Sequence, residues 1–296
     1  MIAIDIQKQL QTGTATLALN IQMQIAQGAM VSLLGSSGTG KTTLLRMLAG
    51  LSRPDGGHII VNDQVWFDAN TRMFKPPQAR SVGMVFQDYA LFPNLSVADN
   101  IAYALNKTDT RQLAHLLEIT GLSALSQRLP GSLSGGQKQR VALARALARV
   151  MLTESRILLL DEPLSALDEG LRHQLQDELL SLHRQFGLTT ILVSHDVGEV
   201  FKLAQQVYCL EAGRIARQGT PAEIFLHQQV QGKLNLQAQV LAIRQEEVVY
   251  VLSLLVGQEI VDIIASASEV TGLNVGDRIT MSAKAFSPLI FKQPNG

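Results

Sequence analysis

One eight-residue segment constrains the fold of this chain more than any other. Residues 35–42 read Gly-Ser-Ser-Gly-Thr-Gly-Lys-Thr and fit the pattern G-x-x-x-x-G-K-[ST] in full. A strand-like apolar run, residues 30–34, precedes the segment, and a helical run, residues 43–48, follows it. Glycine permits a tight backbone path, and a helix N-terminus favours negative charge. This strand–loop–helix unit therefore predicts a loop that wraps a nucleoside triphosphate.

The side chains of this loop predict individual roles. Lys41 is expected to lie against the β- and γ-phosphates, and the Thr42 hydroxyl is expected to bind Mg²⁺. The nucleotide-binding residues expected here are Gly35, Ser36, Ser37, Gly38, Thr39, Gly40, Lys41, Thr42 and Thr43.

A second segment predicts the hydrolytic part of the site. Residues 157–162 read Ile-Leu-Leu-Leu-Asp-Glu, which indicates a central parallel strand buried on both faces. Its acids would emerge at the carboxyl end of the sheet, where ligands bind in open α/β folds. Asp161 is expected to hold Mg²⁺, and Glu162 to polarise the attacking water. A solvated turn is the alternative for an isolated Asp-Glu pair, but the complete phosphate loop disfavours it.

Another buried-type strand, residues 189–194, ends at His195. A neutral imidazole at this sheet edge can hydrogen-bond the γ-phosphate or the attacking water. The alternative is an ordinary surface histidine.

Residues 133–137 read Leu-Ser-Gly-Gly-Gln and precede a helix rich in Ala, Leu and Arg. This pattern predicts a second anion-binding helix N-terminus, with Ser134 as its cap or as a donor to phosphate. A single nucleotide site rarely needs two anion-binding helix N-termini. We therefore expect a twofold dimer in which Ser134, Gly135, Gly136 and Gln137 of one subunit close on the nucleotide of the other.

Together these segments strongly resemble the ATP-binding-cassette ATPases of membrane transporters, over roughly residues 1–230. The resemblance rests on residues 35–42, 85–87, 133–137, 161–162, 165–168 and 195, in this order. It implies ATP and Mg²⁺ as cofactors, and a catalytic set of Lys41, Gln87, Glu162 and His195. In this family Gln87 would contact Mg²⁺ and sense the γ-phosphate, His195 would be the switch histidine, and Asp168 would lie at the dimer seam. The implied assembly is a head-to-tail homodimer enclosing two ATP molecules and acting on transmembrane permease subunits.

One departure concerns the adenine base. The family usually stacks an aromatic residue on adenine, but residues 10–17 contain no Phe, Tyr or Trp. Apolar contact from Leu10 or Leu17 is the expected substitute.

The segments around these motifs predict subdomains. Residues 1–30 and 56–86 alternate as strands and predict an antiparallel subdomain, with turns at residues 56–57 and 62–63. Residues 97–152 predict a helical subdomain that carries Ser134. Tyr89, Leu91 and Phe92 follow Gln87, and they read equally well as core residues or as a groove for a permease coupling helix.

The character of the chain changes near residue 234. Residues 234–296 show short strands with turns at Gly257, Gly272 and Gly276, which predicts a small all-β, OB-like barrel. This segment resembles the Mop/TOBE-like oxyanion-binding barrels of molybdate-type importers. Residues 66–68 and 76–80, in the cassette, also resemble the ATPases of those importers. Ser282 and Lys284 are candidates to bind a tetrahedral oxyanion. The alternative is a barrel that only packs, dimerises or regulates.

Composition narrows the function classes. The formal net charge is zero, which argues against a nucleic-acid partner. Lys138, Arg140, Arg145 and Arg149 lie on one predicted helix and would flank a phosphate site or a solvated face. The single Cys209 reads as a buried thiol in a reducing compartment. We find no signal-peptide pattern, so we expect a cytoplasmic protein that is peripheral on the membrane.

The sequence thus predicts an α/β fold: a P-loop cassette of residues 1–230 and a C-terminal barrel of residues 234–296. The leading function is the ATPase subunit of an importer for an inorganic oxyanion, most simply molybdate. Alternatives are a ferric iron, sulfate or polyamine importer, a soluble cassette ATPase, or a non-hydrolytic oxyanion-binding regulator.

Overall fold

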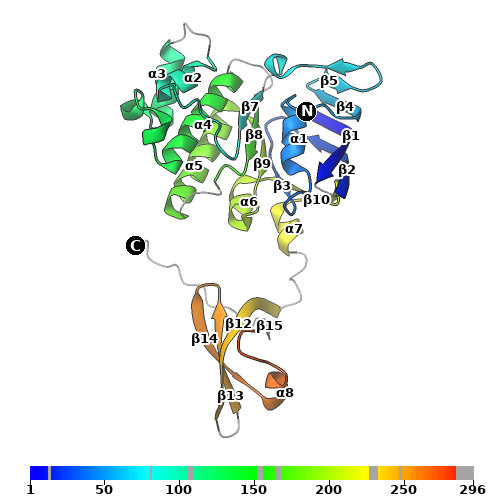
Figure 1. The fold of residues 1–296 in the computed structure, drawn as a ribbon, viewed down its shortest axis with the longest axis vertical. Helices are drawn as coiled ribbons and strands as arrows, with labels where there is room; N and C mark the ends of the chain where they lie inside the picture. The colour runs from blue at the N-terminus through cyan, green and yellow to red at the C-terminus, as the bar shows by residue number, and fades with distance from the viewer. Residues whose placement is uncertain are drawn as a thin grey trace. The chain divides into compact units, whose positions relative to one another are not determined.

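The computed structural model describes residues 1–12, 15–80, 82–105, 110–151, 156–164, 169–226, 233–246 and 249–284. The chain divides into two compact units, Met1–Ile224 and Phe225–Gly296 (Figure 1). Among the described residues, none of the helices combines the length and the apolar character needed to span a bilayer.

A six-stranded sheet forms the centre of the first unit. Its order is β11-β10-β3-β9-β8-β7, and only β11 is antiparallel to its neighbour. The strands are β3 (Met30–Leu34), β7 (Val82–Val85), β8 (Ile157–Asp161), β9 (Thr189–Val193), β10 (Gln206–Glu211) and β11 (Arg214–Gly219). Every residue of β8 and β9 is buried, as expected for central parallel strands with apolar sequences. Cys209 is a buried free thiol in β10, as predicted.

A five-stranded antiparallel sheet has the order β2-β1-β4-β5-β6. Its strands are β1 (Ile2–Thr12), β2 (Ala15–Ile25), β4 (Gly56–Val61), β5 (Gln64–Asp68) and β6 (Met73–Phe74). Alternate residues of β1, namely Ile2, Ile4 and Ile6, are buried in a core cluster shared with helix α1 (Lys41–Leu48). The period of two in the sequence therefore places one face of this sheet on the core.

Two details of the predicted antiparallel subdomain were wrong. The range 56–86 extends too far, because β7 pairs in parallel with β8 in the central sheet. Residues 56–57 are not a turn, because both glycines lie within β4 and Gly57 pairs with Ile6. At Gly57 φ is +87°, and a Cβ would lie 2.0 Å from the carbonyl oxygen of Asp5. Glycine at position 57 therefore allows β4 to lie close to the backbone of β1. The turn at Asn62 and Asp63 is confirmed by φ angles of 46° and 64°.

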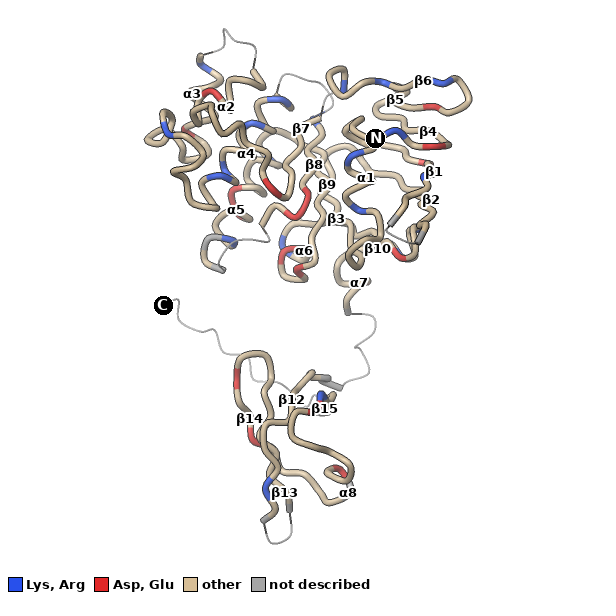
Figure 2. The backbone as a smooth tube through the Cα atoms, viewed as in Figure 1, with Lys and Arg blue, Asp and Glu red and all other residues tan. Residues whose placement is uncertain are grey.

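The helices after α1 are α2 (Val97–Ala102), α3 (Thr110–Ile119), α4 (Gly135–Met151), α5 (Glu169–Phe186), α6 (Val197–Leu203) and α7 (Pro221–Leu226), with 3-10 turns at Pro77–Ala79, Ser123–Leu125 and Pro130–Ser132. Helices α1, α4 and α6 contact strands of the central sheet, and α2 and α3 pack against α4 (Figure 1). Buried residues of α2, α3, α4 and β8 form a second core cluster. Helix α4 lies so close to β7 that a Cβ on Gly83 would meet the Ala146 carbonyl oxygen at 2.3 Å. Lys/Arg and Asp/Glu positions are interleaved over this unit (Figure 2).

The second unit is an antiparallel sheet of order β14-β13-β12-β15. Its elements are β12 (Lys233–Glu246), β13 (Val249–Val256), β14 (Glu259–Ala265), α8 (Ala267–Val270) and β15 (Arg278–Lys284). In the register, Ser282 is opposite Asn235 and Lys284 is opposite Lys233. Residues 285–296 of the predicted barrel lie outside the described residues. The α/β cassette fold with a C-terminal β unit is thus confirmed.

Candidate functional site

The phosphate loop joins the end of β3 to the start of α1, as the motif predicts. Two of its glycines leave no room for a side chain. A Cβ on Gly35 (φ +153°) would lie 2.4 Å from the Leu210 carbonyl oxygen, and a Cβ on Gly40 (φ +103°) would lie 2.5 Å from Leu19. The loop is therefore packed closely between β10 and β2, with its backbone at the N-terminus of α1. Such a cradle suits the phosphates of a nucleotide.

Lys41 extends back along this loop. Its Nζ donates to the carbonyl oxygens of Gly35 at 2.7 Å and Ser36 at 2.9 Å. Burial lowers the pKa of Lys41 below its usual range, while Glu162 and Asp161 act in the opposite direction. A positive charge is thus held inside the cradle, where a triphosphate needs it.

Thr42 and Asp161 form the candidate Mg²⁺ site. The Thr42 hydroxyl donates to Asp161 Oδ1 at 3.1 Å. Burial raises the pKa of Asp161, and this hydrogen bond partly opposes the shift. A hydroxyl and a carboxylate beside a phosphate cradle are the hard oxygen ligands that Mg²⁺ prefers, so the residues fit the ion. In the described part of the chain, no cluster of three or more His, Cys, Asp or Glu residues provides another metal site.

Glu162 follows β8 with a left-handed backbone, φ 48°. Its amide donates to the Val193 carbonyl oxygen at 3.1 Å. Gln87 Nε2 lies 3.5 Å from Glu162 Oε2, and His195 Nδ1 lies 3.9 Å from Glu162 Oε1. The His195 side chain is 69% exposed. The structure thus gathers Gln87 and His195 around the acid predicted to be the base.

The second predicted cradle begins α4. The Ser134 amide donates to Gln137 Oε1 at 3.0 Å, and the Gln137 amide donates to Ser134 Oγ at 3.3 Å. These reciprocal bonds form a capping box. Ser134 Oγ accepts in this box, so its own proton remains available to a phosphate oxygen. Asp168, predicted at the dimer seam, lies outside the described residues.

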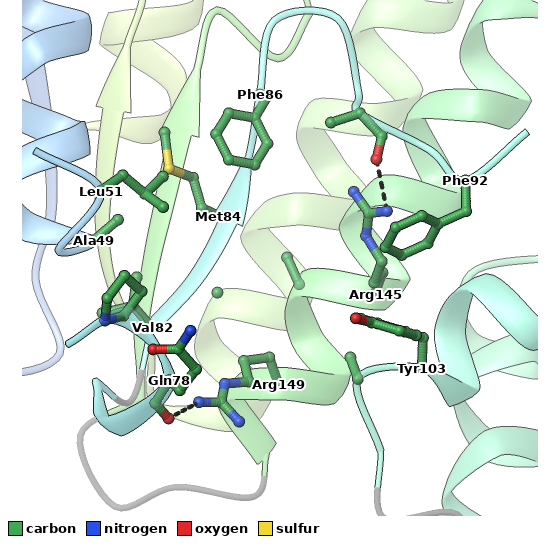
Figure 3. Close-up of a pocket in the computed structure, with 15 residues that line it drawn as sticks. Ala49, Leu51, Gln78, Val82, Met84, Phe86, Phe92, Tyr103, Arg145 and Arg149 are labelled. Atoms are coloured by element: carbon green, nitrogen blue, oxygen red, sulfur yellow. Dashed lines mark hydrogen bonds between the residues drawn. The ribbon is translucent and has the colours of Figure 1, made fainter.

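A groove borders the segment that follows Gln87. This α4 groove has a volume of about 580 Å³, and its walls include Leu51, Met84, Phe86, Phe92, Tyr103 and Arg145 (Figure 3). Of the three residues predicted as core or groove, Phe92 lies on the wall. Tyr89 and Leu91 pack against the second core cluster.

Arg145 and Arg149 do not have the role predicted for them. Arg145 donates to the carbonyl oxygens of Ala90 at 2.8 Å and Tyr89 at 2.9 Å, and Arg149 donates to that of Gln78 at 2.5 Å (Figure 3). Both side chains therefore tie loops to α4 rather than flank a phosphate. Tyr89 and Ala90 have positive φ angles of 62° and 42°. Nothing in the residue types signals that backbone conformation.

Arg80 is a further residue whose role the sequence did not reveal. It is 1% exposed, and it donates to the carbonyl oxygens of Met47, Leu48 and Lys75 at 2.6, 2.8 and 2.8 Å. Its guanidinium lies over the rings of Phe74 and Trp66, 5.1 and 5.5 Å from their centroids. Burial lowers its pKa to about 10. Since Met47 and Leu48 end α1, Arg80 caps the helix that begins at the phosphate loop.

Comparisons with known proteins identify the family of this chain. Residues 18–165 match the family model described as ABC transporter. A sulfate/thiosulfate import ATP-binding protein, CysA 2, of Chromobacterium violaceum is 49% identical over 218 residues, which cover 72% of this chain and 57% of that protein. A probable sulfate/thiosulfate import ATP-binding protein of Chlorella vulgaris is 43% identical over 213 residues, covering 70% of this chain and 86% of that protein.

Solved structures of related cassettes have a fold similar to that of this chain over about three quarters of its length. The dimeric post-hydrolysis structure of the ATP-binding cassette MJ0796 with ADP and Pi has a TM-score of 0.63 at 27% identity, and it covers 75% of this chain and 99% of that one. Clostridium perfringens cbiO1, part of the ABC transporter complex cbiONQ, has a TM-score of 0.65 at 28% identity, with 77% and 92% covered. The chain belongs to the ABC transporter family, as one of its ATP-binding subunits.

Proposed function

We propose that this protein is the ATP-hydrolysing subunit of an ABC importer that takes up sulfate or thiosulfate. One observation carries the hydrolytic part. Asp161 ends β8, and Glu162 and His195 follow β8 and β9, while Lys41 and Thr42 begin α1 after the loop that follows β3. Thr42 contacts Asp161, and His195 lies near Glu162. The carboxyl edge of the sheet is where ligands bind in open α/β folds.

The residues divide the chemistry of hydrolysis among them. The phosphate loop amides and Lys41 bind the β- and γ-phosphates and stabilise charge that develops on them. Mg²⁺, when bound by Thr42, Asp161 and Gln87, supplies further positive charge. Glu162 orients the attacking water and accepts its proton, and His195 hydrogen-bonds the γ-phosphate or that water. Adenine is held by apolar contact from Leu10 or Leu17.

The capping box at Ser134 supports a composite site. Residues 134–137 present a helix N-terminus and a hydroxyl proton to an anion, although the phosphate loop already cradles one. In a head-to-tail homodimer, these residues close on the partner's ATP. The relatives' fold is compatible with this arrangement, since MJ0796 cassettes are described as dimeric.

The relatives' names support sulfate or thiosulfate over molybdate. Both curated relatives described above are named for sulfate/thiosulfate import, whereas molybdate rested on the short resemblance of the C-terminal segment. Neither of these two relatives is named for import of ferric iron or polyamines. The chain spans 57% of the length of the first relative. The identity of the transported solute is therefore part of this proposal.

We further propose the domain plan and the membrane partner. Residues 1–230 form the ATPase domain, with a helical subdomain over about 97–152, and residues 234–296 form a Mop/TOBE-like domain in which Ser282 and Lys284 bind an oxyanion or regulate transport. The α4 groove receives a permease segment at the cytoplasmic face of the membrane. Exposed Phe92 and Tyr103 on its wall support an apolar contact there.

Glu162→Gln tests the ATPase and dimer proposals together. The variant keeps the shape of the site but cannot accept the proton, so we expect it to bind Mg-ATP, lose turnover and accumulate as a dimer in light scattering. Wild-type protein should hydrolyse ATP and remain largely monomeric. A variant that turns over ATP at the wild-type rate would remove Glu162 from its role.

The solute needs a separate measurement. In proteoliposomes that contain the cognate permease, sulfate should drive ATP hydrolysis and uptake at lower concentration than molybdate. The reverse order would favour the molybdate hypothesis instead.

A further inference from the structure

The two residues that flank His195 are tied to one buried carboxylate, that of Glu199. Glu199 is 4% exposed and lies in the first turn of α6. The Ser194 hydroxyl donates to Glu199 Oε2. The same hydroxyl accepts from the amide of Asp196 at 3.1 Å. Ser194 and Asp196, on either side of His195, are therefore both linked to Glu199, and the Ser194 hydroxyl is their common partner.

Asp196 is held from two further directions. Its Oδ1 accepts from the Glu199 amide at 2.8 Å, which caps α6. Its Oδ2 accepts from Arg172 of α5 at 3.1 Å. An ordinary capping box would use the glutamate to bind the cap amide directly. Here a serine hydroxyl is inserted between them, and that serine lies between the end of β9 and His195.

The His195 side chain takes no part in this network. It is exposed and directed at the catalytic edge, 3.9 Å from Glu162 Oε1. The backbone on both sides of it is fixed, so the imidazole position is set by the network and by its own side-chain rotamer. Sub-ångström placement of a catalytic group matters, because a misplacement of about 1 Å can reduce a rate by roughly a hundredfold.

A small cavity adjoins both Glu162 and the hydrogen-bond network around Glu199. It has a volume of about 30 Å³ and is lined by Glu162, Leu164, Arg172, Ser194, Asp196 and Glu199, together with His195. Glu199 Oε1 is buried and has no hydrogen-bond partner among the described residues. The ionisable groups facing Glu199 are Asp196, Arg172 and His195. A buried carboxyl with one unsatisfied oxygen lowers stability, so a fold that retains Glu199 has a use for its other oxygen, Oε2, which accepts from Ser194.

We propose that Glu199 and Ser194 are positioning residues that set the place of His195 relative to Glu162. The inference rests on the proposed ATPase function. Glu199 acts through its oxygen as a hydrogen-bond acceptor, neither as an acid nor as a base. A glutamine, which keeps that acceptor, should therefore replace it in the reaction, whereas an alanine should not.

Steady-state ATP hydrolysis by the full chain is the first test. We expect Glu199→Ala and Ser194→Ala to lower kcat by about ten- to a hundredfold, with KM for ATP nearly unchanged. Glu199→Gln should retain most of the wild-type kcat. The matched control is Glu223→Ala, because Glu223 accepts from the Thr220 amide at 2.7 Å in the cap of α7, away from the site. Wild-type kcat in both alanine variants, or equal loss in Glu199→Gln and Glu199→Ala, would overturn the proposal.

The imidazole itself provides a test that does not require turnover. The chain has six histidines, and the Cε1–H signal of His195 is assigned by its absence in His195→Ala. This signal should be single and sharp in the wild type and in Glu199→Gln, but broadened or multiple in Ser194→Ala. An unchanged signal in Ser194→Ala would contradict the proposal even if the variant folds normally. Wild-type protein without ATPase activity would refute the proposed function, and the spectra would still decide the role of Glu199 and Ser194.

Discussion

Replacing Arg80 with leucine is expected to destabilise the Met1–Ile224 unit by about 3–5 kcal/mol. The three bonds of 2.8 Å or less from its guanidinium to carbonyl oxygens set the scale. Each hydrogen bond to a charged group contributes about 1.5–3 kcal/mol, which gives roughly 4.5–9 kcal/mol before offsets. The desolvation of the buried guanidinium, which the variant avoids, reduces that sum.

Urea and thermal unfolding followed by circular dichroism would measure the effect. For a unit of this size, about 2–4 °C are lost per kcal/mol, so the midpoint should fall by roughly 6–20 °C. The matched control is Arg53→Leu. Arg53 is exposed and lies over the same Phe74 ring, 5.6 Å from its centroid, so its loss should change stability by about 1 kcal/mol or less. Equal stability losses in the two variants, or an Arg80→Leu midpoint within 2 °C of wild type, would refute the reasoning.

Three further predictions follow from the contacts described. Lys41→Ala should weaken ATP binding at least about tenfold in titration calorimetry, because it removes the charge inside the cradle; undiminished affinity would contradict its role. Gly57→Ala should lower the urea midpoint, since its Cβ would overlap the Asp5 carbonyl oxygen, and an unchanged midpoint would count against the β4 register. Burial raises the pKa of Glu199, so its stabilising contribution is complete below the ordinary glutamate pKa and is lost as pH rises through the raised value. Glu199→Gln should therefore gain stability relative to wild type as the pH rises above the ordinary glutamate pKa, and the opposite trend would exclude this shift.

The sequence predicted those parts of the site that depend on local pattern. The phosphate loop, the buried strands before Asp161 and His195, and the cap at Ser134 each follow from a few consecutive residues, and the structure has them. The strands of residues 233–284 were also predictable, because alternating residues and glycine turns mark them.

What could not be predicted depends on contacts between distant segments. Arg80 is separated by more than 30 residues from the carbonyl groups of Met47 and Leu48 that it caps. The two glycines of β4 looked like a turn, because a close approach by Asp5 cannot be read from residue type. Arg145 and Arg149 looked like solvated or phosphate-binding charges, since the loops they hold lie 55 and 71 residues away in the chain.

The left-handed backbone of Glu162 has a consequence for engineering. A non-glycine residue in that conformation costs about 1–3 kcal/mol, so glycine at this position should yield a more thermostable but inactive protein. Selection for heat resistance alone would then favour loss of the base. Screens for robust variants of this protein should accordingly require turnover at every round.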